Sequence, residues 1–165
     1  MLTINGHDNM LQRKTVQIGD IFQILTSEGV CYGQAINKNA QWDFVVAIFR
    51  EFYGKHPSDF TELVNREPQF ITTFVLQYAV RQRLFALVDN VPVAKALAEF
   101  PTFRSTNNLN GDETMWFFWN GSREWKVHRP LTAEEKKFPK GPSLPSAPLL
   151  IKRIQEDYRV ERDYI

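Results

Sequence analysis

The sequence predicts an α+β fold, in which a strongly bent antiparallel β-sheet or partly open β-barrel is accompanied by two or three short helices. Three β-rich runs follow one another between residues 21 and 49, separated by turn-forming residues, as in an antiparallel meander. A second hairpin is predicted where Asn120-Gly121 separates two aromatic-rich runs. Helical periodicity is confined to short stretches, so we expect the helices to close the ends of the sheet.

The chain has 165 residues, 43% of them hydrophobic, which is enough for one domain with a substantial core. Residues 1–15 are polar and irregular, and we expect them to form a flexible N-terminal arm. Residues 16–165 are then expected to form a single domain.

Charge and cysteine content exclude several classes of protein. The net charge of +1 provides no global field to attract nucleic acid or an anionic membrane. The single Cys31 excludes an intramolecular disulfide bond. No apolar run is long enough to cross a bilayer, and the N-terminus lacks the order of a signal peptide. We therefore expect a cytoplasmic protein with no membrane partner.

The predicted sheet begins with strands at 21–26, 30–37 and 42–49. Gly29 is expected to complete the first turn, and Gly33 to admit a neighbouring ring or backbone. In the third run apolar side chains fall on both faces, so we expect this strand to be central.

Further along the chain, the predicted elements are short. They are a helix over 58–65 with Ser58 as its N-cap, a strand over 70–76, and a helix over 93–99. The stretch 78–88, YAVRQRLFALV, fits a helical turn or a strand. We expect the 70–76 strand and the aromatic hairpin to complete the sheet begun by the meander.

The aromatic hairpin allows a register to be predicted. With a two-residue turn, Trp119 faces Ser122 and Trp116 faces Trp125. Alternation then places Trp116, Phe118, Trp125 and Val127 on a face that we expect to be core. The other face combines Met115, Phe117 and Trp119 with Ser122, Glu124 and Lys126. That face suits either a strand covered by a loop or an exposed recognition surface.

The C-terminal region is predicted to be mostly irregular. Residues 131–138 are expected to form one helical turn, and the proline-rich stretch 139–150 an extended strap on the surface. We expect the chain to continue as a strand through Leu150, Ile151 and Ile154 and to end as a charged tail.

No residue pattern in the sequence is typical of catalysis. His7, His56 and His128 are the candidate bases, and each fits a solvated or edge histidine better than a catalyst. Cys31 has no basic neighbour to lower its pKa, so we expect it to act as a small apolar residue. No His or Cys pair has the spacing of a metal site, and the glycines form no phosphate-binding loop. We therefore expect no enzymatic activity, no cofactor and no metal.

Nucleic-acid binding also has little support. Basic residues come closest to the required pattern at 81–83, 123–129 and 152–153, and nearby acidic residues dilute each of these groups. A compact β-rich domain with aromatic surface and no reaction centre favours a protein that binds another protein. We expect no small-molecule substrate.

The order of several short motifs resembles the immunity protein 26 family of bacterial polymorphic-toxin and contact-dependent growth inhibition systems. The motifs are GDIF at 19–22, YGQ at 32–34, a covered strand ending at Phe49, a bend at 90–92, PTFR at 101–104, the WFFWNGSREWKV hairpin, LTAEE and LLIKRI. The resemblance spans about residues 16–155. It implies a cytoplasmic, non-catalytic protein that binds a cognate toxin C-terminal domain one to one and neutralises it by occlusion. No catalytic residues are carried over.

The residues expected to bind the toxin combine aromatic anchors with local groups of acids, since such anchors supply much of the energy at protein interfaces. They are Asp112, Glu113, Phe117, Trp119, Glu124, Glu156, Asp157, Glu161 and Asp163. The near-zero net charge argues against neutralisation by a strongly acidic face. Two alternatives stay open: a small β-barrel adaptor or nucleic-acid-associated module, and a hydrolase that uses Cys31 or His128.

Overall fold

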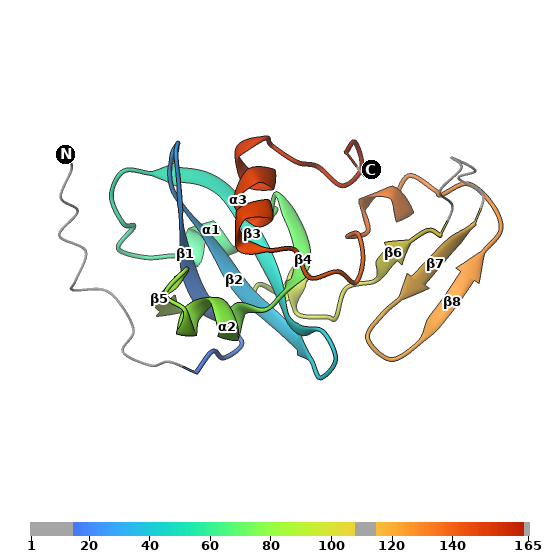
Figure 1. The fold of residues 1–165 in the computed structure, drawn as a ribbon, viewed down its shortest axis with the longest axis horizontal. Coiled ribbons are helices and arrows are strands. Elements are labelled where there is room, and N and C mark those ends of the chain that lie inside the picture. The colour runs from blue at the N-terminus through green and yellow to red at the C-terminus, as the bar shows by residue number, and fades with distance from the viewer. Residues whose placement is uncertain (1–14, 108–114, 164–165) are drawn as a thin grey trace.

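The structure, a computed structural model, describes residues 15–107 and 115–163. In this part of the chain, eight strands form two antiparallel sheets, accompanied by three short α-helices (Figure 1). The predicted α+β class is therefore confirmed. The sheets do not close into a barrel, so the fold is not the β-barrel that the sequence also allowed.

The first sheet has five strands in the order β4-β3-β2-β1-β5. Their bounds are Asp20–Thr26 for β1, Gly29–Asn39 for β2, Asp43–Tyr53 for β3, Phe70–Phe74 for β4 and Ala86–Asn90 for β5. The meander is formed as predicted, with β3 inside the sheet between β2 and β4. The ambiguous stretch 78–88 divides between the end of a helix and β5, which pairs with β1.

The second sheet contains the aromatic hairpin, which the sequence had placed in the first sheet. Its strands are β6 (Phe103–Ser105), β7 (Trp116–Trp119) and β8 (Glu124–Val127), in the order β6-β7-β8. Figure 1 shows this small sheet at one end of the molecule, beyond β4.

The predicted hairpin register is wrong by two residues. Trp116 pairs with Val127 and Trp119 with Glu124, because the connection is a four-residue loop rather than a two-residue turn. The Asn120 side chain organises this loop by accepting hydrogen bonds from the backbone N–H groups of Ser122 and Arg123, at 3.2 and 2.9 Å. An even shift leaves every side chain on its predicted face, so Trp116 and Phe118 are still buried.

The helices are short, and their positions differ from several predictions. They are α1 (Thr61–Val64), α2 (Leu76–Arg81) and α3 (Ala147–Gln155), with 3-10 turns η1 (Lys95–Leu97) and η2 (Glu135–Lys137). Ser58 does not cap α1; the Asp59 carboxylate instead accepts from the Thr61 N–H at 2.8 Å. The expected helix over 93–99 is only the η1 turn.

The predicted strand through Leu150 and Ile154 is wrong, because this segment is helix α3. The Ser146 hydroxyl caps it by accepting from the Leu149 N–H at 3.3 Å. Leu150 and Ile154, four residues apart, then lie on one helical face and are fully buried. In a strand, Lys152 would share the face of Leu150 and Ile154, whereas in the helix it is exposed to solvent.

Two hydrophobic clusters cover the two faces of the first sheet. One joins alternate residues of β1 to β4 to α2 and α3, and includes Phe22, Leu76 and Leu150. The other packs the remaining strand residues against α1 and Phe103 of the second sheet. Residues 44–49 of β3 are buried without exception, as predicted for a central strand. Within the described residues, no helix has the length and apolar composition of a bilayer span.

Candidate partner-binding surface

The outer face of the β7–β8 hairpin presents apolar side chains beside charged ones. Phe117 lies opposite Lys126, and the Lys126 ammonium is 5.9 Å from the centre of the Phe117 ring. Met115, next to the start of β7, is 38% exposed, and Phe117 is half-buried. Glu124 is exposed on the same face. This face of the hairpin therefore combines an apolar contact surface with charges of both signs.

Trp119 occupies the same face but is engaged in the fold. Its ring packs edge-on against Phe100, with centres 5.2 Å apart, and lies 5.8 Å from the ring of Phe103. Phe103 is completely buried in the second hydrophobic cluster. The sequence left open whether this face is covered or exposed, and the structure divides it: Trp119 packs against Phe100 and Phe103, Phe117 is half-buried, and Met115 is exposed.

The acidic residues expected to bind a toxin lie mostly beside cations. Asp112 and Glu113 fall outside the described residues. The Glu156 carboxylate is 3.8 Å from the Lys152 ammonium, and an Asp157 oxygen is 3.0 Å from the Arg159 guanidinium. Glu161 is exposed to solvent.

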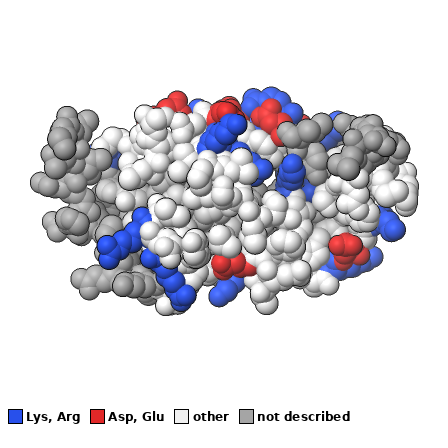
Figure 2. Space-filling model, in the orientation of Figure 1, with Lys and Arg blue, Asp and Glu red and all other residues white. Residues whose placement is uncertain are grey.

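Asp163 is the most firmly held of these carboxylates. It accepts hydrogen bonds from the Arg162 guanidinium and from the backbone N–H of Arg159, at 2.6 and 3.0 Å. The Arg162 hydrogen bond, followed by the Arg159 N–H, lowers the pKa of Asp163 below its usual value. Figure 2 shows basic and acidic side chains side by side over α3 and the C-terminal segment. The C-terminal acids thus belong to a mixed-charge surface rather than to an acidic face.

A contact that the sequence did not predict joins His56 to Tyr32. The His56 Nδ1 atom is 2.5 Å from the hydroxyl of the buried Tyr32, whose ring packs edge-on against Phe60. A cavity of about 200 Å³ lies beside His56 and is also lined by Ser58 and Asp89. The two partners are 24 residues apart, and a histidine before Pro57 has the sequence context of a solvated loop residue, so no local signal indicated the pair.

The residues considered for hydrolysis are poorly placed for it. Cys31 is fully buried in β2, and burial raises the pKa of its thiol to about 12, so the nucleophilic thiolate is strongly disfavoured. His128 is exposed at the end of the hairpin. Within 15–107 and 115–163, no group of three or more His, Cys, Asp or Glu residues is arranged to hold a metal ion.

Comparisons with known proteins add no family to this description: no protein-family model matches the chain, and no curated protein or solved structure is found to be similar to it.

Proposed function

We propose that this protein is a non-catalytic immunity protein, similar to the immunity protein 26 family, that acts in the bacterial cytoplasm. It binds a cognate toxin C-terminal domain one to one and neutralises it by occlusion. The observation that carries the proposal is the outer face of the β7–β8 hairpin, where exposed Met115 and half-buried Phe117 share a face with Glu124 and Lys126. The order of motifs between residues 16 and 155 supports the choice of family.

Phe117 has the properties of an interface anchor. Its ring is already half-buried on a hydrogen-bonded strand, so less side-chain entropy is lost when a partner covers it. Aromatic side chains of this kind supply a large share of the binding energy at protein interfaces. Met115 adds an adaptable apolar surface beside it.

The charges around this anchor favour recognition by shape and apolar contact over bulk electrostatic attraction. Glu124 and Lys126 provide a polar rim of both signs. The C-terminal acids Glu156, Asp157 and Asp163 are already paired with cations, so their negative charge is partly neutralised before any partner arrives. Occlusion through the hairpin is the mechanism that agrees with both features.

Co-expression with the toxin domain encoded by the adjacent gene tests the proposal. The native chain should protect cells and elute with the toxin domain as a one-to-one complex in size-exclusion chromatography. Phe117→Ala should weaken the complex by about tenfold or more, as removal of an interface anchor does. Circular dichroism and a melting curve must show that the variant is folded.

Tyr78→Ala is the matched control, since Tyr78 is an aromatic residue 59% exposed on α2, away from the hairpin. It should protect cells as well as the native chain does. Absence of protection and of a complex with the native chain would contradict the immunity function. Equal losses in both variants would contradict the assignment of the hairpin as the binding surface.

A further inference from the structure

The five-stranded sheet has two edge strands, β4 and β5. The proline-rich stretch lies against β4, where the Ser143 N–H donates to the Thr73 hydroxyl at 3.1 Å. In contrast, β5 pairs with β1, and no other strand of the described chain pairs with its outer edge. Figure 1 shows β5 on the side of the sheet that faces away from β7 and β8. The outer edge of β5 can therefore accept a strand from another molecule.

A strand added to β5 would lie between two layers of the fold. Leu87 of β5 belongs to the hydrophobic cluster that contains α2, and Val88 belongs to the cluster that contains Phe60. Because these clusters cover opposite faces of the sheet, alternate side chains of an added strand would point toward α2 and toward the segment 56–60. The two sets of side chains would therefore meet different surroundings.

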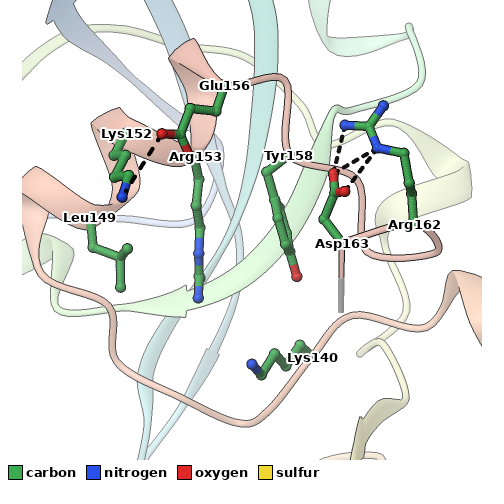
Figure 3. A pocket seen from close by; sticks show the side chains of 8 residues that line it. All are labelled: Lys140, Leu149, Lys152, Arg153, Glu156, Tyr158, Arg162 and Asp163. Atoms are coloured by element: carbon green, nitrogen blue, oxygen red, sulfur yellow. Dashed lines mark hydrogen bonds and ion pairs between the residues drawn. The ribbon is translucent and has the colours of Figure 1, made fainter. Parts of the chain in front are cut away.

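The side toward α2 is basic. Arg81 ends α2 and Arg83 lies in the turn that leads into β5; both are exposed, and no acidic residue occurs between residues 76 and 88. Within the described residues, neither guanidinium has a hydrogen-bond or ion-pair partner. By contrast, the Arg162 guanidinium is paired with Asp163, 2.6 Å away (Figure 3). Arg81 and Arg83 are thus available to a partner that carries negative charge.

The backbone of Arg83 has a conformation that favours glycine over arginine. Its φ is 59°, in the left-handed region. The Arg83 N–H donates to the Val80 carbonyl at 3.1 Å and the Leu84 N–H to the Ala79 carbonyl at 2.9 Å, a pattern with which glycine commonly ends a helix. Glycine would complete this turn at lower cost, so the turn itself gives no reason for an arginine. A contact of the exposed guanidinium with another molecule would supply that reason.

Exposed apolar side chains lie at both ends of β5. Leu84, two residues before the strand, is 54% exposed. Ile18 is 52% exposed and lies near the other end, where its carbonyl accepts from the Asn90 side chain at 3.2 Å. A segment that runs along β5 can therefore bury apolar surface at each end, in addition to its backbone hydrogen bonds.

The side toward residues 56–60 contains the cavity beside His56, which is also lined by Val88 and Asp89 of β5. Its volume of about 200 Å³ is below the range of about 300–1,000 Å³ for small-molecule sites, so it suits one side chain of an added strand better than a whole ligand. The Asp89 carboxylate disfavours a second acid in this cavity, whereas Phe60 and Val88 favour an apolar side chain.

We propose that β5 binds an extended segment of another protein by strand addition, and that acidic and apolar residues alternate in this segment. The acids meet Arg81 and Arg83 on one side, and the apolar residues face the cavity on the other. Residues 1–14 of this chain carry two cations and one acid, so they lack the matching charge. A second copy of β5 is followed and preceded by no acidic run and brings the same two arginines. The partner is independent of the toxin proposed to bind at the hairpin.

Fluorescence anisotropy of the full chain with a labelled ten-residue peptide, in which glutamate alternates with valine, tests the proposal. We expect saturable binding that weakens as salt is added, since exposed charges are screened. The same peptide with lysine in place of glutamate should bind at least about tenfold more weakly, because its charge is reversed. A glutamate–valine peptide with a central proline should also bind more weakly, since proline interrupts strand pairing.

Hydrogen–deuterium exchange locates the bound peptide. The amides of β5, residues 86–90, should exchange more slowly when the glutamate–valine peptide is bound. The amides of β4, residues 70–74, are the internal control at the opposite edge, and their exchange should not change.

Arg83→Gly is the decisive variant, because it removes the cation and supplies the residue that the turn favours. Its melting temperature should not fall, whereas its affinity for the glutamate–valine peptide should fall roughly threefold, as loss of an exposed ion pair predicts. Arg81→Gln should weaken binding to a similar extent. Arg123→Gln, at an exposed arginine next to β8, is the matched control and should leave the affinity unchanged.

Several results would overturn the proposal. They are absence of saturable binding, equal affinity for the glutamate and lysine peptides, an unchanged affinity in Arg83→Gly, and unchanged exchange of residues 86–90. Tighter binding of a ten-nucleotide single-stranded DNA than of the glutamate–valine peptide would assign the surface to nucleic acid instead.

Discussion

Gly33 on β2 pairs directly with Phe22 on β1, and the aromatic ring lies over the glycine. A Cβ atom at position 33 would come within 2.3 Å of Phe22 Cζ. The ring cannot move aside easily, because Phe22 is fully buried and stacked on Phe85 with centres 5.6 Å apart. The expectation that this glycine admits a neighbouring ring is confirmed, since only a residue without a side chain fits under Phe22.

Gly33→Ala is therefore expected to lower the free energy of unfolding by about 1–3 kcal/mol, the usual cost of overpacking a core. Urea denaturation followed by circular dichroism measures the change. Gly54→Ala is the matched control, because a Cβ there would meet nothing within 4 Å. Equal effects of the two substitutions would contradict the role of the Phe22 ring.

The reactivity of the Cys31 thiol tests whether this side chain is buried and protonated. Because burial raises its pKa to about 12, the thiol is protonated throughout the range from pH 7 to pH 9. We expect no reaction with Ellman's reagent in the native protein at pH 8, and rapid reaction in concentrated urea. Native-state modification faster than unfolding would show that the thiol is accessible and ionised.

Helix α3 shows how one side chain can decide the start of an element. Ser146 accepts from the Leu149 N–H, and Pro148 lies in the first turn, where a proline costs no hydrogen bond. At the other end of α3, Arg50 on β3 donates from Nε to the Ile154 carbonyl at 2.9 Å. Both ends of the helix are thus stabilised, one locally and one by a distant strand.

Ser146→Ala is expected to destabilise the protein by about 1 kcal/mol, as loss of an N-cap hydroxyl does. Ser58→Ala is the matched control, since the sequence favoured Ser58 as a cap, whereas in the structure Phe60 is the N-cap of α1 and the Asp59 carboxylate accepts from the Thr61 N–H. We expect its stability to change by less than about 0.5 kcal/mol. Urea unfolding of the two variants and of the native chain measures both changes in stability.

The sequence predicted the faces of the aromatic hairpin correctly but its register wrongly. Alternation alone assigns Phe117 and Trp119 to the same face, because side-chain direction is a local property of a strand. Only the tertiary structure shows that Trp119 packs against Phe100, whereas Phe117 is half-buried opposite the exposed Lys126. The candidate surface is therefore smaller than the sequence indicated.

At the scale of the whole molecule, Arg104 ties separate segments together from its buried position in β6. Its guanidinium donates to the carbonyls of Lys136, Phe138 and Val160, at 2.8, 3.1 and 3.0 Å. It also lies over the Trp116 ring, 5.2 Å from its centre. The second sheet, the region of the η2 turn and the C-terminal segment consequently share one buried hydrogen-bonding centre.

We expect the two sheets to unfold together, because Phe103 is buried in the same cluster as strands of the first sheet. In a Trp42→Phe protein, tryptophan fluorescence reports only on the hairpin, since the other three tryptophans are Trp116, Trp119 and Trp125. The urea midpoint from fluorescence should coincide with that from far-ultraviolet circular dichroism. An earlier fluorescence transition would show that the second sheet is an independent unit.

The sequence by itself determined the α+β class, the meander, the central position of β3 and the inward face of the hairpin. These properties depend on the alternation of neighbouring side chains and on turn residues, which are local. The tertiary structure decided that 150–154 is a helix and that the hairpin belongs to a second sheet. It also joined His56 to Tyr32 and placed β5 at an edge of the first sheet. These outcomes depend on contacts between segments that are distant in the sequence. The energies of such contacts cannot be predicted from a local sequence pattern.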